Sequence, residues 1–310
     1  MAKSSVQIRP AIVKQPVLYK RRWWDSEASL GYLLIGPAFI FLLVVLAYPF
    51  VMAISLSLSR KSLGADAIFV GFDNFAKLAA SARFWLTVKN SLIYTAGSLV
   101  LKFAGGLALA QLLNRQFFGK RTITALILLP WIIPTVFSTL AWWWMLDPAN
   151  SIINILLKRW GLITNSLPFL VDATWAMMSL IFLNVWRGVP FFAITFLAAI
   201  QTVSEELLEA AKMDGADAWQ RFWRITFPLI VPVVVIVVLI STISTLSDFE
   251  LPYLLTQGGP RDATLVFGLL SYNYALNIGQ LGMGAAVSLA MLPLLAVLVI
   301  FSLVELRRQN

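Results

Sequence analysis

Polar side chains that interrupt the apolar stretches of this chain are the first candidates for chemistry. Asn184, Trp186 and Arg187 lie together within one such stretch, and Pro190 follows them and frees a backbone carbonyl. Aromatic faces combined with a few polar side chains are the groups that hold a sugar in a protein pocket. The cluster therefore predicts either contact with a polar solute or hydrogen bonding between packed helices.

Other polar side chains stand inside or just beyond apolar stretches. Lys102 lies deep in one of them, where a charge costs about 2.5–3.5 kcal/mol, so we expect it to snorkel, to pair with another helix or to line a pore. Asp248, Glu250 and Tyr253 follow another apolar stretch, and we expect them either at the outer mouth of a pathway or in solvent. Asn273, Tyr274 and Asn277 are weaker candidates of the same kind.

The residues that are missing narrow the possible chemistry. The 310 residues include no cysteine and no histidine, which excludes disulfides, Cys/His metal sites and acid–base catalysis by histidine. The glycine-rich phosphate-binding loop is also missing, because Gly119-Lys120-Arg121 lacks the upstream glycine and the following hydroxyl. Asp, Glu, Lys, Tyr and Ser remain, so composition alone does not exclude an enzyme. With no constellation of such residues apparent, we expect no catalytic residues, no metal and no cofactor.

The composition is that of a membrane protein. Hydrophobic residues make up 59% of the chain and charged residues 13%, with a mean hydropathy of +0.81, whereas a soluble domain is about a quarter charged. Six segments are apolar over roughly the 20 residues that cross a bilayer as a helix. They cover residues 30–58, 86–113, 123–146, 173–199, 227–247 and 282–304. Because lipid cannot satisfy open backbone amides, these segments predict an all-α membrane protein of six transmembrane helices.

The basic residues predict the orientation of these helices. With the N-terminus inside, the inner segments hold roughly twice as many Lys and Arg as the outer ones, so both termini are expected to be cytoplasmic. Residues 1–29 then form a cytoplasmic leader, 30–304 the six-span domain and 305–310 a cytoplasmic tail. The net charge of +9 is accordingly attributed to contact with anionic membrane lipids and not with nucleic acid.

One cytoplasmic segment, residues 202–228, is longer and more polar than an ordinary connection. Thr202 and Glu205 have the spacing of a capping box, which predicts that a helix begins there. Gly215 predicts the end of that helix, since glycine enters the left-handed conformation at little cost. A second short amphipathic run, rich in aromatic residues, follows at 219–224. Two short helices that expose apolar residues at the membrane surface predict a docking element, with a generic interfacial helix as the alternative.

This segment also carries a motif. Glu209-Ala210-Ala211-Lys212-Met213-Asp214-Gly215, then nine residues, then Ile225-Thr226-Phe227-Pro228 closely resembles the EAA motif of ABC importer permeases, with Phe227 where leucine is usual. Residues 70–75, 186–191 and 255–260 resemble stretches of the binding-protein-dependent sugar permeases of the maltose-transporter type. In order and position relative to the spans, the resemblance covers nearly the whole chain from about residue 30.

The resemblance implies the type I ABC importer permease fold in a bacterial inner membrane. It also implies that the EAA loop forms coupling helices which dock on an ATP-hydrolysing subunit, through Glu209, Ala210, Ala211, Asp214 and Gly215. The implied partners are a second permease subunit, expected to be a different chain although a second copy stays open, two ATP-binding subunits and an extracytoplasmic solute-binding protein. The implied solute is a carbohydrate, or a carbohydrate-like polyol or glycerol phosphate.

Two other classes of protein remain as alternatives. A secondary transporter or channel driven by an ion gradient would predict inverted repeats and ionisable residues in the middle of broken spans. A membrane-embedded enzyme would need an acid, a base and a nucleophile at a common depth, which the sequence does not present.

Overall fold

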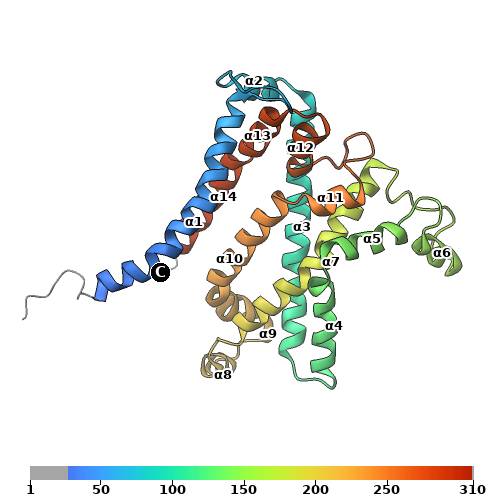
Figure 1. Cartoon of the computed structure of the whole chain (residues 1–310). Helices are drawn as coiled ribbons and strands as arrows, with labels where there is room; N and C mark the ends of the chain where they lie inside the picture. The colour runs from blue at the N-terminus through green and yellow to red at the C-terminus, as the bar shows by residue number, and fades with distance from the viewer. Residues whose placement is uncertain (1–26, 309–310) are drawn as a thin grey trace, which may run out of the picture. The chain divides into compact units, whose positions relative to one another are not determined.

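The computed structural model describes residues 27–308 and is almost entirely helical (Figure 1). Most of the predicted leader and the last two residues of the predicted tail lie outside the described residues. The helices are α1 (Glu27–Ser57), α2 (Asp73–Ala79), α3 (Ala82–Asn114), α4 (Lys120–Ile132), α5 (Thr135–Met145), α6 (Ile152–Arg159), α7 (Ala173–Ile200), α8 (Glu205–Met213), α9 (Ala218–Arg221), α10 (Phe227–Leu246), α11 (Glu250–Leu255), α12 (Phe267–Tyr272), α13 (Leu281–Ala290) and α14 (Leu292–Arg308). Two π-helical segments, η2 (Phe222–Thr226) and η3 (Asn273–Asn277), follow α9 and α12.

The chain divides into two compact units, residues 1–52 and 53–310. The described part of the first unit consists of most of α1, an apolar helix that contains Pro37 and Pro49. The second unit contains all the other elements, among them the loop at 202–228 and the polar residues singled out in the sequence.

Within residues 27–308, five helical stretches are long and apolar enough to cross a membrane. They are residues Gly31–Ser57, Ala82–Asn114, Ala173–Ile200, Ala218–Leu246 and Leu281–Ile300, and each coincides with one of the predicted spans. The fourth of these joins α9, η2 and α10, so it begins nine residues before the predicted start at 227. The fifth joins α13 and α14, which meet at Met291.

The third predicted span, residues 123–146, is not one continuous helix but is broken near its middle. α4 ends at Ile132, α5 begins at Thr135, and the two are bent by 92° at the break. Pro134 explains this bend, because a proline disfavours the helical conformation at the residue before it. Ile133 accordingly has extended backbone angles, with φ −65° and ψ 128°. The pair α4–α5 is thus either a broken sixth span or a re-entrant segment.

The core of the second unit is the contact between α3 and α7, which pack along each other (Figure 1). Gly106 permits their close approach, since a Cβ built there would overlap Cβ of Phe192 and lie 3.2 Å from the backbone carbonyl carbon of Phe192. Small residues have this role where transmembrane helices touch. α10 packs against both helices and completes the group that surrounds the cavity described below.

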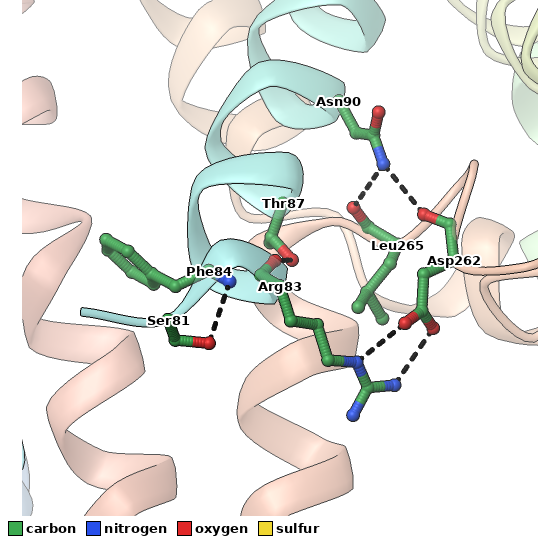
Figure 2. A network of polar contacts seen from close by, with 7 residues as sticks. All are labelled: Ser81, Arg83, Phe84, Thr87, Asn90, Asp262 and Leu265. Atoms are coloured by element: carbon green, nitrogen blue, oxygen red, sulfur yellow. Dashed lines mark hydrogen bonds and ion pairs between the residues drawn. The ribbon is translucent and has the colours of Figure 1, made fainter. Parts of the chain in front are cut away.

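A loop after α11 is fastened to the beginning of α3 (Figure 2). Arg83 donates two hydrogen bonds to the carboxylate of Asp262, at 2.7 and 2.9 Å. The buried Asn90 side chain donates to the backbone carbonyls of Asp262 at 2.8 Å and Leu265 at 3.3 Å. The loop needs such support, because Arg261 and Asp262 have positive φ angles of 49° and 61°, which are uncommon for residues with a side chain.

A short hairpin connects α1 to α2. Strand β1 (Ser59–Arg60) pairs antiparallel with β2 (Ile68–Phe69). The buried side-chain amide of Asn74 on α2 donates to the backbone carbonyls of Ser57 at 2.7 Å and Ser59 at 3.0 Å. These bonds join α2 to the beginning of the hairpin.

Candidate coupling loop and intramembrane cavity

The predicted loop at 202–228 folds as two short helices, α8 and α9, followed by η2 and α10. They lie at the same end of the second unit as the end of α3 (Figure 1), and Arg115 at that end shares a small cavity with Arg221 of α9. Glu205 and Glu206 occupy the first turn of α8, where acidic side chains stabilise the helix dipole.

The capping box predicted at Thr202 and Glu205 is wrong. The Thr202 hydroxyl donates to the Ala199 carbonyl at the end of α7, at 2.8 Å, and Ser204 occupies the N-cap of α8 without a side-chain capping bond. A capping box does occur one helix later, at the start of α9. The Asp217 carboxylate accepts from the backbone amide of Gln220 at 2.7 Å, and Oε1 of Gln220 accepts from the backbone amide of Asp217 at 3.2 Å. The boundary was misplaced because α7 continues to Ile200 and uses Thr202 to close its own last turn.

Gly215 ends α8, as predicted. Its φ is +83°, its amide donates to the Lys212 carbonyl at 3.1 Å, and the Ala216 amide donates to the Ala211 carbonyl at 2.9 Å. This pair of bonds is the Schellman arrangement, which needs a left-handed residue at this position. No atom of the described part of the chain lies within 4 Å of where a Cβ of Gly215 would be, so the conformation of Gly215, and not its packing there, requires glycine.

The outer surface of α8 and α9 is left uncovered by the other residues that the structure describes. Of the motif residues, Glu209, Ala210, Asp214 and Gly215 are exposed and Ala211 is half-buried. Three large apolar side chains are exposed beside them: Leu207 by 52%, Met213 by 87% and Trp219 by 71%. Exposed apolar groups within a charged loop are typical of a surface that a partner or a membrane covers.

The second candidate site is a cavity of ≈ 360 Å³ among α3, α4, α5, α7, α10 and the beginning of α11. The predicted residues Asn184, Arg187, Asp248 and Glu250 line it, together with Lys102. The structure thus brings together polar side chains from positions 102, 184–187 and 248–250, which are far apart in the sequence.

The other predicted solute contacts do not line this cavity. The ring of Trp186 packs edge-on against Trp142 at 5.5 Å between centroids. Tyr253 stacks on Phe249 at 5.0 Å. Asn273, Tyr274 and Asn277 belong to η3, which contacts α12 and α13.

A buried tyrosine that was not predicted organises one wall of the cavity. The Tyr94 hydroxyl donates to Oδ2 of Asp248 at 2.7 Å and accepts from the Asn184 amide at 2.7 Å. Asn184 also donates to Oδ2 of Asp248 at 3.3 Å, so one network joins α3, α7 and the segment after α10. The sequence offered one signal, since a tyrosine within a predicted span needs a partner for its hydroxyl.

Lys102 pairs with a neighbouring helix and also lines the cavity. Its ammonium donates to the hydroxyls of Ser241 at 3.2 Å and Thr245 at 2.9 Å, both on α10. Its stem lies over Gly188, where an added Cβ would come within 2.6 Å of Lys102 Cδ. The expected pairing of Lys102 with another helix is therefore confirmed, whereas its role in lining a pore stays a prediction.

Comparison with known proteins identifies the family. Residues 102–308 match the family model of the binding-protein-dependent transport system inner membrane component. The chain belongs to this family of permeases. The match includes Lys102, Arg187, Asp248 and the whole of the loop with α8 and α9.

Relatives of this permease match it over most of its length. It is 33% identical to the trehalose/maltose transport system permease protein MalF of Thermococcus litoralis, over 85% of this chain and 88% of that protein. It is 31% identical to the sulfoquinovosyl glycerol transport system permease protein SmoG of Agrobacterium fabrum, over 88% and 89% of the two chains. It is 32% identical to the inner membrane ABC transporter permease protein YcjO of Escherichia coli, over 92% and 95%.

Solved structures agree with the fold. A chain of a bacterial ABC transporter involved in the import of the acidic polysaccharide alginate superposes with a TM-score of 0.79 at 27% identity, over 93% of this permease and 99% of that chain. A methionine ABC transporter, MetNI, matches at 19% identity with a TM-score of 0.50. The predicted permease fold is confirmed, and the chain is a membrane subunit of an inner-membrane transport system and not an enzyme.

Proposed function

We propose that this permease imports a sugar or a sugar-like solute, delivered by an extracytoplasmic binding protein and driven by ATP hydrolysis in separate subunits. Relatives named for trehalose/maltose and sulfoquinovosyl glycerol transport support the solute class. A solved neighbour, the alginate transporter at 26% identity, in complex with a pentasaccharide-bound periplasmic protein, supports delivery by a binding protein.

The observation that carries the proposal is the exposed surface of α8 and α9. Glu209, Ala210, Ala211, Asp214 and Gly215 are the proposed docking residues for an ATPase subunit. The small side chains at 210 and 211 permit close approach of the partner. The exposed Met213 and Trp219 supply apolar area, and large apolar anchors of this kind dominate many interfaces.

The proposed complex contains a second permease subunit, expected to be a different chain, and two ATP-binding subunits. The excess of basic residues in the inner segments supports a cytoplasmic position for both termini and for α8 and α9. ATP binding then draws the ATPase subunits together and moves α8, and rigid-body rearrangement of the spans switches the cavity between inward and outward access. Asn184, Arg187, Asp248 and Glu250 are the proposed solute contacts on this path, joined by Lys102.

Substitution of Gly215 tests the coupling role. Asp at this position must hold φ +83° and adds a charge to the proposed interface, so we expect binding-protein-stimulated ATP hydrolysis by the reconstituted complex to fall by tenfold or more. Gly119→Asp is the matched control, because Gly119 has φ +77° with nothing within 4 Å of a Cβ and lies in the connection between α3 and α4.

The comparison separates coupling from backbone strain. Equal loss in both variants would mean that any strained loop at this end of the molecule stops the cycle, and the docking role would be wrong. Normal assembly and transport with Gly215→Asp would contradict it directly. Uptake driven by an ion gradient, with no ATPase subunit present, would favour the secondary transporter instead.

A further inference from the structure

The cavity contains two cationic side chains that no carboxylate of the described chain neutralises at close range. Among the residues that the structure describes, Lys102 bonds only to the hydroxyls of Ser241 and Thr245. Arg187 makes no hydrogen bond within residues 27–308, and its Nε is buried without a partner. Neither cation belongs to an ion pair among the described residues.

Neither acidic residue of the cavity forms an ion pair with these cations among the described residues, although Asp248 interacts electrostatically with both at longer range. Oδ2 of Asp248 accepts bonds from Tyr94 and Asn184, and Oδ1 accepts from the Leu251 amide at 3.3 Å. Asp248 is thus held as part of the wall, more than 4.0 Å from the nitrogens of both cations. Glu250 is an exposed residue at the beginning of α11.

This arrangement is costly unless a ligand completes it. Each charge at membrane depth costs about 2.5–3.5 kcal/mol, which a hydroxyl or amide side chain would avoid. A neutral sugar needs only such uncharged groups to hold its hydroxyls. The planar guanidinium of arginine, however, fits an oxyanion with two parallel hydrogen bonds, and a lysine supplies a second positive charge to the same group.

We infer that the cavity receives a sugar that carries an oxyanion, such as a carboxylate, sulfonate or phosphate, with Arg187 as the principal contact and Lys102 as its electrostatic partner. Asn184 and Ser244 line the same space. Oδ1 of Asn184 has no partner among the described residues, and Oγ of Ser244 donates to the Ile240 carbonyl, so both oxygens can accept from sugar hydroxyls. Trp131 and Phe191, stacked at 5.9 Å between centroids, line it as well and offer an apolar face to the ring. The inference rests on the proposed import of sugars and narrows the class of solute.

The test uses the complete complex in proteoliposomes with its binding protein, and measures ATP-dependent uptake of size-matched sugars. The neutral probe is glucose, and the acidic probes are glucuronate, glucose 6-phosphate and 6-deoxy-6-sulfoglucose, which carry a carboxylate, a phosphate and a sulfonate. Disaccharides that contain each of these sugars are tested as well. We expect the wild type to import at least one acidic sugar more efficiently than its neutral counterpart. Arg187→Gln should raise the KM for that acidic sugar about tenfold to a hundredfold, because a charge-assisted pair of bonds is lost.

The controls separate recognition from a structural effect. Arg187→Lys keeps the charge without the planar fork, so it should retain part of the affinity for the acidic sugar. Arg159→Gln makes the same change at an exposed position on α6 and should leave uptake unchanged. If Arg187→Gln does not assemble, Lys102→Met is compared in its place, with the same selective loss for the acidic sugar expected.

Three results would overturn the inference. Import of neutral sugars alone by the wild type would leave the proposed function standing and contradict the oxyanion site. Import of none of the sugars would contradict both. An equal loss for acidic and neutral sugars in both cavity variants would mean that the two cations support the packing of the helices and do not select the solute.

Discussion

Replacement of Gly106 by alanine tests the contact on which the cavity depends. A methyl group at this position would overlap Cβ of Phe192 and would lie 3.2 Å from the Phe192 carbonyl carbon and 3.3 Å from the Ala193 amide nitrogen. These last two are backbone atoms of α7, which cannot rotate away as a side chain can. The alanine therefore forces α3 and α7 apart, and this also moves Lys102 relative to Arg187.

The expected magnitude follows from two opposing effects. Overpacking of a close contact costs about 1–3 kcal/mol, and the upper end applies here because the obstructing atoms include backbone. Alanine in place of glycine inside a helix contributes about 1 kcal/mol of stability. We therefore expect Gly106→Ala to lower the free energy of unfolding by about 2 kcal/mol.

The neighbouring glycine supplies the control and the refuting result. A Cβ at Gly105 would lie 3.2 Å from Cγ2 of Val189, a methyl group that can shift, so Gly105→Ala should be neutral or stabilising by up to about 1 kcal/mol. Both variants are compared with the wild type by thermal and detergent-induced unfolding of the purified permease. If Gly106→Ala proves as stable as Gly105→Ala, the close α3–α7 contact is not what holds the second unit together.

Three further substitutions test the polar contacts, each by the same unfolding measurements. Asn90→Ala leaves two loop carbonyls without their donor and should cost about 2–4 kcal/mol; an unchanged stability would mean that the loop needs no anchor. Tyr94→Phe removes the hydroxyl bound to Asp248 and should cost about 1–3 kcal/mol, whereas no loss would show that the carboxylate finds another donor. Asp217→Ala removes the capping box of α9 and should lower the free energy of unfolding by about 1 kcal/mol. Ser204→Ala, at a helix cap without a side-chain bond, should change the stability little. Equal effects of the two substitutions would contradict the capping assignment.

The spans were predictable because hydropathy over some twenty residues depends on composition alone. The break between α4 and α5 was missed because both halves are apolar, so the average hydropathy hid the effect of Pro134. In the loop, Gly215 was assigned correctly since a left-handed helix end strongly favours glycine. The start of α8 was not, because Thr202 can cap a new helix or close the previous one, and only the tertiary structure decides between them.

Part of the cavity lining was predictable, because charged residues stand out in an apolar segment. Arg187 and Lys102 are conspicuous in apolar surroundings, so they could be singled out from the sequence. Tyr94 was overlooked because a tyrosine is ordinary in such a segment, and its role appears only when α3 brings it to Asp248. Trp186 and Tyr253 were proposed by residue type, but their neighbours Trp142 and Phe249 engage their rings.

One continuous helical stretch connects the coupling loop to the cavity. α9, η2 and α10 form a continuous helical stretch of 29 residues, Ala218–Leu246, which at 1.5 Å per residue is about 43 Å long. This helical stretch begins a few residues after Gly215 and ends two residues before Asp248. A helix is stiff along its axis, so in the proposed coupling a displacement of α8 by an ATPase subunit would be transmitted along this stretch to the wall of the cavity. The wider turn of η2 is the place where this stretch can bend, so in the proposed mechanism the stiffness of those five residues would set how much of the movement of α8 reaches the cavity.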